Sequence, residues 1–229
     1  MTDADRPTIS PGWAALVTLG YLCGGFLGGM ATGIAVGGAS AHLPPPLTVV
    51  IPGIAAIAIM VLTSTAWART IAVRLGSSET QRVTRAGALG FGPMVILIAS
   101  ALTLLEPRAV SARTFPIHVV YGLLFVPATF AVAAGTIGTL GIGLRMERRA
   151  GLRLAIKSGA ASAFAFLIVY LAMDAAGWQV GAPEARQRAT MLVVTGVSAL
   201  AAAVAGGFVL GSSLRVQALS TQQRFGFYT

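Results

Sequence analysis

The chain has 229 residues, of which 55% are hydrophobic and 10% are charged, and its mean hydropathy is +0.80. Soluble domains carry about 25% charged residues, so this composition excludes an ordinary soluble protein and predicts an integral membrane protein. The net charge of +9 would favour nucleic acid in a soluble chain, but no nucleic-acid-binding motif accompanies it, and we expect no such partner.

Six charge-poor runs are long enough to cross a membrane, which takes about 20 apolar residues for about 30 Å of hydrocarbon. The runs cover residues 12–40, 47–67, 86–105, 117–144, 159–176 and 189–213. The sequence therefore predicts an all-α integral membrane protein, a six-helix bundle that forms one membrane domain over residues 1–229 with short polar tails.

The first predicted helix, 12–40, holds two series of glycines at four-residue spacing. They are Gly20, Gly24 and Gly28, and then Gly25, Gly29, Gly33 and Gly37. Small residues let helix backbones approach closely in lipid, where the hydrophobic effect does not drive helices together. Two smooth faces indicate a helix packed on two sides, deep in its own bundle or between the bundle and another subunit. The later helices supply small-residue partners at Gly135, Gly206, Gly207 and Gly211.

Charge asymmetry predicts the orientation, because Lys and Arg are enriched on cytoplasmic loops. If the N-terminus is cytoplasmic, twelve of the 16 basic residues fall on that side. The outer side then receives Arg108, Arg113, Arg186 and Arg188. The sequence therefore predicts that both termini are cytoplasmic (N-in, C-in) and that the protein lies in a bacterial inner, cytoplasmic membrane.

A basic segment follows the fourth predicted helix. Arg145, Arg149, Arg153 and Lys157 recur every four residues, so we expect helix 117–144 to continue into a surface helix with one basic side. Such a side would contact anionic lipid headgroups, at roughly 1 kcal/mol per basic residue. A plain topology signal and an acidic partner protein are the alternatives.

Catalytic chemistry is missing from the predicted membrane interior. The helix centres contain no Asp, Glu, Lys, Arg or His, the groups that usually mark intramembrane enzymes and ion-coupled transporters. No Walker A loop, HExxH pair, GxSxG elbow or CxxCH motif occurs. A single cysteine, Cys23, excludes an internal disulfide and a cysteine-based metal cluster. We therefore expect no catalytic residues, no metal site and no enzyme activity.

Several polar residues share the predicted outer membrane level. They are His42, Glu106, His118, Tyr121, Asp174 and Trp178. Two imidazoles can ligate a haem, and a histidine beside a carboxylate can bind a quinol headgroup. His42 and His118 are therefore candidate cofactor-binding residues, with a quinone, haem or pigment at a subunit interface as the cofactor. Belt residues of the membrane interface give the same pattern.

These features favour a non-catalytic structural or accessory subunit of a larger membrane complex, respiratory or photosynthetic for example. In this interpretation the glycine-rich first helix packs against other integral membrane subunits. Smooth helix faces and the absence of ionisable groups from the bilayer both fit this role. A rhomboid-type intramembrane protease needs a GxSG serine and a histidine on a later helix, and the sequence has neither.

The alternative is a small-solute transporter or its membrane-embedded substrate-binding component. Six predicted helices, a mass of 23.3 kDa and cytoplasmic termini resemble the substrate-binding components of energy-coupling-factor vitamin transporters. In that family a small-xxx-small pattern docks the transmembrane coupling subunit, and Gly20, Gly24 and Gly28 would be the matching positions. The polar pocket residues of that family are not evident in this sequence.

Overall fold

The computed structural model describes residues 9–90, 117–177 and 184–225, and these residues contain helices and no strand. The helices are α1 (Pro11–Ala39), α2 (Pro45–Arg74), α3 (Thr80–Ala88), α5 (Ile117–Gly143), α6 (Arg148–Ala175) and α7 (Glu184–Phe225). Five stretches are long and apolar enough to cross a membrane: Pro11–Ala39, Val50–Arg74, Leu124–Gly143, Arg148–Ala175 and Val193–Arg215. The chain is therefore an all-helical membrane protein with five candidate spans in its described part.

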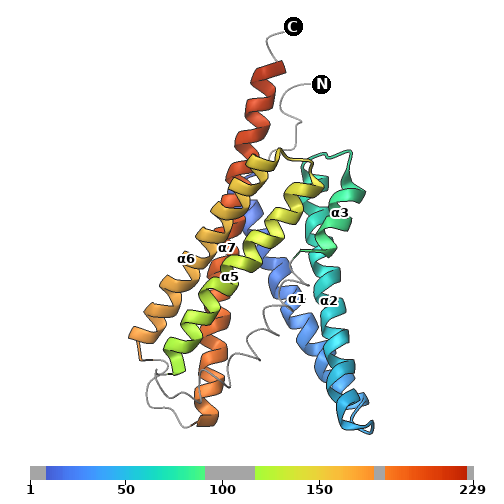
Figure 1. The fold of residues 1–229 in the computed structure, drawn as a ribbon, viewed down its shortest axis with the longest axis vertical. Coiled ribbons are helices and arrows are strands. Elements are labelled where there is room, and N and C mark those ends of the chain that lie inside the picture. Colours follow the sequence, from blue (N-terminus) through green and yellow to red (C-terminus); the bar gives the residue numbers. More distant parts are fainter. Residues whose placement is uncertain (1–8, 91–116, 178–183, 226–229) are drawn as a thin grey trace.

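The helices form two arms that meet at one end (Figure 1). One arm is the antiparallel pair α1 and α2, and the other consists of α5, α6 and α7. The arms are joined where α1 packs against α7 and where α3 lies between α2 and α5. We call this the convergent end; it holds the start of α1, the α2–α3 connection, the α5–α6 turn and the end of α7. At the divergent end the α1–α2 connection lies apart from the start of α5.

The main core lies at the convergent end and draws side chains from every described helix. Its buried members are Ile9, Ala14, Trp67, Ala68, Ile71, Ala72, Val83, Ile137, Leu140, Leu154, Leu210 and Leu214. A smaller core, built from Phe166, Tyr170, Val194 and Ala202, holds the second arm together nearer the divergent end. The two arms therefore share a core at one end, and only the α5–α7 arm has a core of its own.

The α1–α2 hairpin packs sparsely beyond the convergent end. Only 11% of the apolar window of α2 is buried, compared with 44% for α6. Exposed apolar side chains of this hairpin include Leu27, Ile34, Ile54 and Leu62. In a membrane these side chains meet acyl chains or another protein, and α2 is the least buried of the candidate spans in the described structure.

Local sequence explains where α1 and α2 begin. The Oγ of Ser10 accepts a hydrogen bond from the Trp13 N–H at 3.2 Å, and Pro11 occupies the first helical position, as is usual for a capped helix start. Pro44 precedes α2, which itself opens on proline. The short connection between the helices keeps α1 and α2 as antiparallel neighbours.

The helix predicted over 86–105 does not begin as expected. The chain instead forms α3, whose last residue is Ala88, and the N–H groups of Leu89 and Gly90 bond back to Ala86 and Gly87 in a turn. In α3, Val83 and Gly87 are buried while Arg82 and Arg85 are exposed, so it is an amphipathic helix on the α2 surface. The rest of the predicted span lies outside the described residues.

The expected continuation of helix 117–144 into the basic segment is also wrong. α5 ends at Gly143, and the N–H groups of Arg145 and Met146 bond to the carbonyls of Ile142 and Gly141, which is the Schellman pattern of a helix C-terminus. Arg145 takes the left-handed position of that turn with φ 54°. The basic residues that follow belong to α6, which starts at Arg148 rather than at the predicted residue 159. α7 likewise extends beyond the predicted 189–213 in both directions.

Candidate helix-docking site

One glycine series of α1 packs against α2. A Cβ built on Gly25 would lie 3.2 Å from Thr63 Cγ2, and one on Gly29 would lie 3.5 Å from the Ala56 carbonyl oxygen. Gly33 and Gly37 face Pro52 at 3.9 and 3.6 Å. These distances are ordinary or tight contacts for a Cβ, so this series lets the two helix backbones approach as small residues do in lipid.

The other glycine series divides between two environments. A Cβ on Gly28 would lie 3.2 Å from Ile59 Cγ2, whereas a Cβ on Gly20 or Gly24 would meet no described residue within 4 Å, and both glycines are exposed. These two glycines line a shallow, open hollow of about 600 Å³ on the surface between α1 and α2. Its walls are formed by Val17, Gly20, Tyr21, Gly24, Leu62, Thr63 and Ala66. We call this hollow the Gly20–Gly24 groove.

A second hollow of about 340 Å³ lies on the other flank of the hairpin. Gly24 and Gly33 are nine residues apart, which at about 100° per residue puts them on opposite sides of α1. The second hollow is lined by Gly29, Met30, Gly33, Ile34, Pro52, Gly53, Ala56 and Met60. The hairpin therefore has a small-residue surface on each flank, and the Gly20–Gly24 groove is the larger.

Polar groups in and beside the Gly20–Gly24 groove already have partners. The hydroxyls of Tyr21 and Thr70 lie 2.7 Å apart, the Thr63 hydroxyl donates to the Ile59 carbonyl, and the Trp67 Nε1–H donates to Thr18 Oγ1 at 3.1 Å. The groove therefore offers shape and apolar contact rather than hydrogen bonds. The sequence did not predict the α2 residues of the groove, Leu62, Thr63 and Ala66, because the spacing of the glycines on α1 does not show which α2 residues lie opposite them.

Two of the three expected α7 glycines pack against α1, at its first turns rather than at its glycine series. A Cβ on Gly207 would lie 2.8 Å from Ala15 Cα, and one on Gly211 would lie 2.8 Å from Pro11 Cα. Gly206 instead faces α6, where an added Cβ would overlap the Ser162 hydroxyl that donates to the Ala202 carbonyl at 2.9 Å. α7 thus supplies the glycines and the start of α1 supplies a close backbone, so this contact is a structural joint between the arms.

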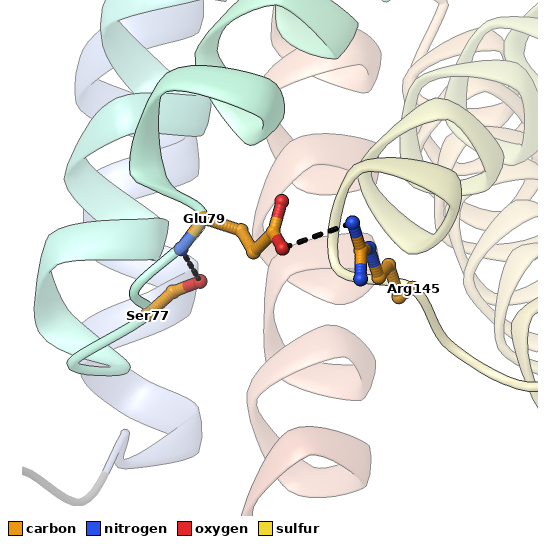
Figure 2. Close-up of polar contacts among 3 residues, drawn as sticks. All are labelled: Ser77, Glu79 and Arg145. Carbon is orange, nitrogen blue, oxygen red and sulfur yellow. Dashed lines mark hydrogen bonds and ion pairs between the residues drawn. The ribbon is translucent and has the colours of Figure 1, made fainter.

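Arg145 is separated from the other residues of the predicted basic stripe. It forms an ion pair with Glu79 across the arms, with 3.1 Å between Nη2 and Oε1 (Figure 2). The Glu79 N–H donates to Ser77 Oγ at 3.2 Å, which holds the acidic residue in the α2–α3 connection. The side chains are 64% and 36% exposed, so solvent screens the pair and its contribution to stability is small. Arg149, Arg153 and Lys157 remain exposed on α6.

Substitutions at Arg145 separate the backbone strain from the ion pair. Arg145→Gly and Arg145→Ala both remove the ion pair, but only glycine adopts a positive φ without a Cβ clash. We expect the glycine variant to be about 1 kcal/mol more stable than the alanine variant, measured by unfolding in mixed micelles. Gly76→Ala, at φ 62° in the equivalent turn after α2, should destabilise similarly. Equal stabilities of the two Arg145 variants would contradict the left-handed turn.

Of the predicted outer-level residues, Glu106 and Trp178 lie outside the described part of the chain, and the others lie on both arms. His42 is exposed in the α1–α2 connection, and His118 lies in the first turn of α5 with its side chain outside the described part. Figure 1 shows these two segments apart at the divergent end, so the structure does not bring them together, and their cofactor role stays a prediction. Asp174, near the end of α6, has a buried Oδ1 with no hydrogen-bond partner among the described residues. No group of three metal-ligating side chains occurs in that same part of the chain.

Comparisons with protein-family models, curated proteins and solved structures find no match to this chain.

Proposed function

We propose that this protein is a non-catalytic subunit of a larger membrane complex, and that its α1–α2 hairpin docks a transmembrane helix of another subunit. The observation that carries the proposal is the Gly20–Gly24 groove: two exposed glycines in a candidate membrane span, at which an added Cβ would meet none of the described residues within 4 Å. In lipid, exposed leucine or phenylalanine is ordinary, but adjacent exposed glycines leave a hollow that acyl chains fill less densely than a close-packed helix does.

The division of packing between the arms supports this role. The α5–α7 arm has its own buried core, whereas the α1–α2 hairpin is joined to the rest of the described molecule near the convergent end. A helix seated in the groove would bury Val17 and Leu62 beside the glycines. It needs small residues of its own at four-residue spacing, because only then do two backbones approach closely.

We propose further that the convergent end faces the bacterial cytoplasm. The start of α1 and the end of α7 lie together at that end, which fits an even number of crossings between them. Arg74, Arg82, Arg149 and Arg215 belong to segments of the same end. This arrangement supports cytoplasmic termini, since basic residues are enriched on that side of the membrane.

The first test is the composition of the native particle. We expect gentle detergent extraction from native membranes to yield this chain in a high-mass particle with stoichiometric membrane partners, identified by native gel separation and mass spectrometry. Migration as a lone particle of its own mass would contradict the subunit proposal. That outcome would make the solute-binding alternative the next to test by ligand screening.

Substitution in the groove tests where the partner docks. Gly20→Leu and Gly24→Leu each fill open space, so we expect the isolated protein to keep its melting temperature while its co-migration with the partner falls at least tenfold. The physical reason is that each leucine holds the incoming helix away from α1.

Gly196→Leu is the matched control, because a Cβ on Gly196 would also meet none of the described residues within 4 Å, but Gly196 lies on α7 outside the groove. We expect this variant to assemble normally. Normal assembly of both groove variants would contradict docking at this site. A large fall in melting temperature of the isolated variants would show instead that the groove is filled within the chain itself.

A further inference from the structure

The exposed face of α6 changes character along the helix. Arg149, Arg153 and Lys157 are all exposed and recur every four residues, so they share one face. Farther along the same face the exposed side chains are apolar: Phe164, Ile168 and Leu171 are 65%, 51% and 54% exposed. Because α6 is one unbroken helix, this face passes from basic to apolar within about two turns.

This transition indicates where the membrane surface crosses α6. In a membrane the apolar part of this face would contact acyl chains, which would put Lys157 at the edge of the hydrocarbon. A lysine there keeps its stem in the apolar region while its ammonium group reaches the headgroups. Leu152 and Ile156 are exposed beside the basic residues, which adds acyl-chain contact at the same level.

The three basic side chains are free to bind an external anion. Within the described part of the chain, the ion pair that the structure shows joins Arg145 to Glu79 and takes none of the three. From Arg149 to Lys157 the helix rises about 12 Å, so the charges run along the membrane normal through the headgroup layer. A lipid phosphate in that layer would therefore have the guanidinium groups of Arg149 and Arg153 toward the aqueous side and the ammonium group of Lys157 toward the hydrocarbon.

We propose that Arg149, Arg153 and Lys157 form a binding site for the phosphate of an anionic phospholipid, with Leu152 and Ile156 holding the upper part of its acyl chains. Guanidinium groups bind phosphate oxygens by paired N–H donors. The structure refines the predicted stripe, because it removes Arg145 from the site and places the remaining three residues on one helix that is long and apolar enough to cross a membrane.

Lipid titration of the purified full-length protein tests this site. Protein in neutral detergent micelles is titrated with phosphatidylglycerol or phosphatidylcholine, and bound lipids are counted by native mass spectrometry. We expect the wild type to prefer phosphatidylglycerol. The R149Q/R153Q/K157Q variant should lose affinity for it on the order of a hundredfold, which is about 1 kcal/mol per basic residue converted to a binding ratio.

The control variant R69Q/R82Q/R85Q removes the same charge from exposed residues of α2 and α3. We expect it to keep the preference for phosphatidylglycerol. A second variant, R149K/R153K/K157R, keeps all three positive charges and should keep most of the binding, so it tests the site even if the Gln variant folds poorly. Equal loss in the control would reduce the effect to net charge and overturn the proposal. Unchanged phosphatidylglycerol binding by the R149Q/R153Q/K157Q variant would also overturn it. If that variant kept the lipid but lost an acidic protein partner in native extracts, the basic residues would bind that protein instead.

Discussion

Gly207→Ala should destabilise the protein by about 2 kcal/mol, the usual size of an overpacking effect. The added methyl group would lie 2.8 Å from Ala15 Cα and 2.9 Å from both the Ala14 carbonyl oxygen and Thr18 Oγ1. Two of these atoms belong to the α1 backbone, so the clash is relieved only if α7 and α1 move apart. Such a movement would open the contact that joins the arms. The measurement is the free energy of unfolding in mixed micelles.

Gly24→Ala is the control for this effect. It adds the same methyl group to a helical glycine, but no residue that the structure describes lies within 4 Å of the new Cβ. Alanine is a better helix former than glycine by about 1 kcal/mol in water, so we expect this variant to match or exceed the wild type. A Gly207→Ala variant as stable as Gly24→Ala would show that the α1–α7 contact is looser than the structure has it.

Trp67→Ala should have the largest single effect, about 3 kcal/mol of lost stability. Trp67 is 5% exposed in the core of the convergent end, and its indole N–H bonds to Thr18 Oγ1 on α1. Truncation leaves a cavity among buried neighbours that include Ile71 and Ala14. In a membrane protein the cost is mainly lost packing, because the unfolded helices also remain in an apolar medium.

Two further variants serve as comparisons for Trp67→Ala. Trp67→Phe keeps most of the ring volume and removes the indole donor, so we expect a loss of about 1 kcal/mol. Trp13→Ala removes a tryptophan that is only half-buried, beneath the Arg74 guanidinium at 5.6 Å from the ring centroid, and should cost less than Trp67→Ala. If Trp13→Ala were the more damaging variant, the shared core would not lie where the structure places it.

Sequence reasoning predicted the spanning helices best where length and caps determine them. The first helix, predicted at 12–40, is observed at Pro11–Ala39, because a proline start and a polar turn bound a long apolar run. The end of α3 could not be predicted in this way, since an apolar, charge-poor stretch continues past it. Gly87 instead packs against Ala68 and the Ser64 carbonyl oxygen, and a contact between helices leaves no mark in the local pattern.

The candidate site was only half visible in the sequence for a related reason. The spacing of the glycines indicated two smooth faces on α1, but the crossing of α1 and α2 decides which face is used and which stays open. The prediction of the basic stripe was wrong at Arg145, because this arginine occupies the left-handed position after α5, where glycine is usual. Arg145 therefore continued the four-residue spacing without belonging to the helix.

The length of α7 has a mechanical consequence. Its 42 residues make a rod of about 63 Å at 1.5 Å per residue, twice the thickness of the hydrocarbon core. The stretch from residue 216 to 225 continues the helix about 15 Å past the candidate span that ends at Arg215. Gly207 and Gly211 pack closely against the start of α1. A force applied to residues 216–225 of α7 would therefore act on this contact between the two arms.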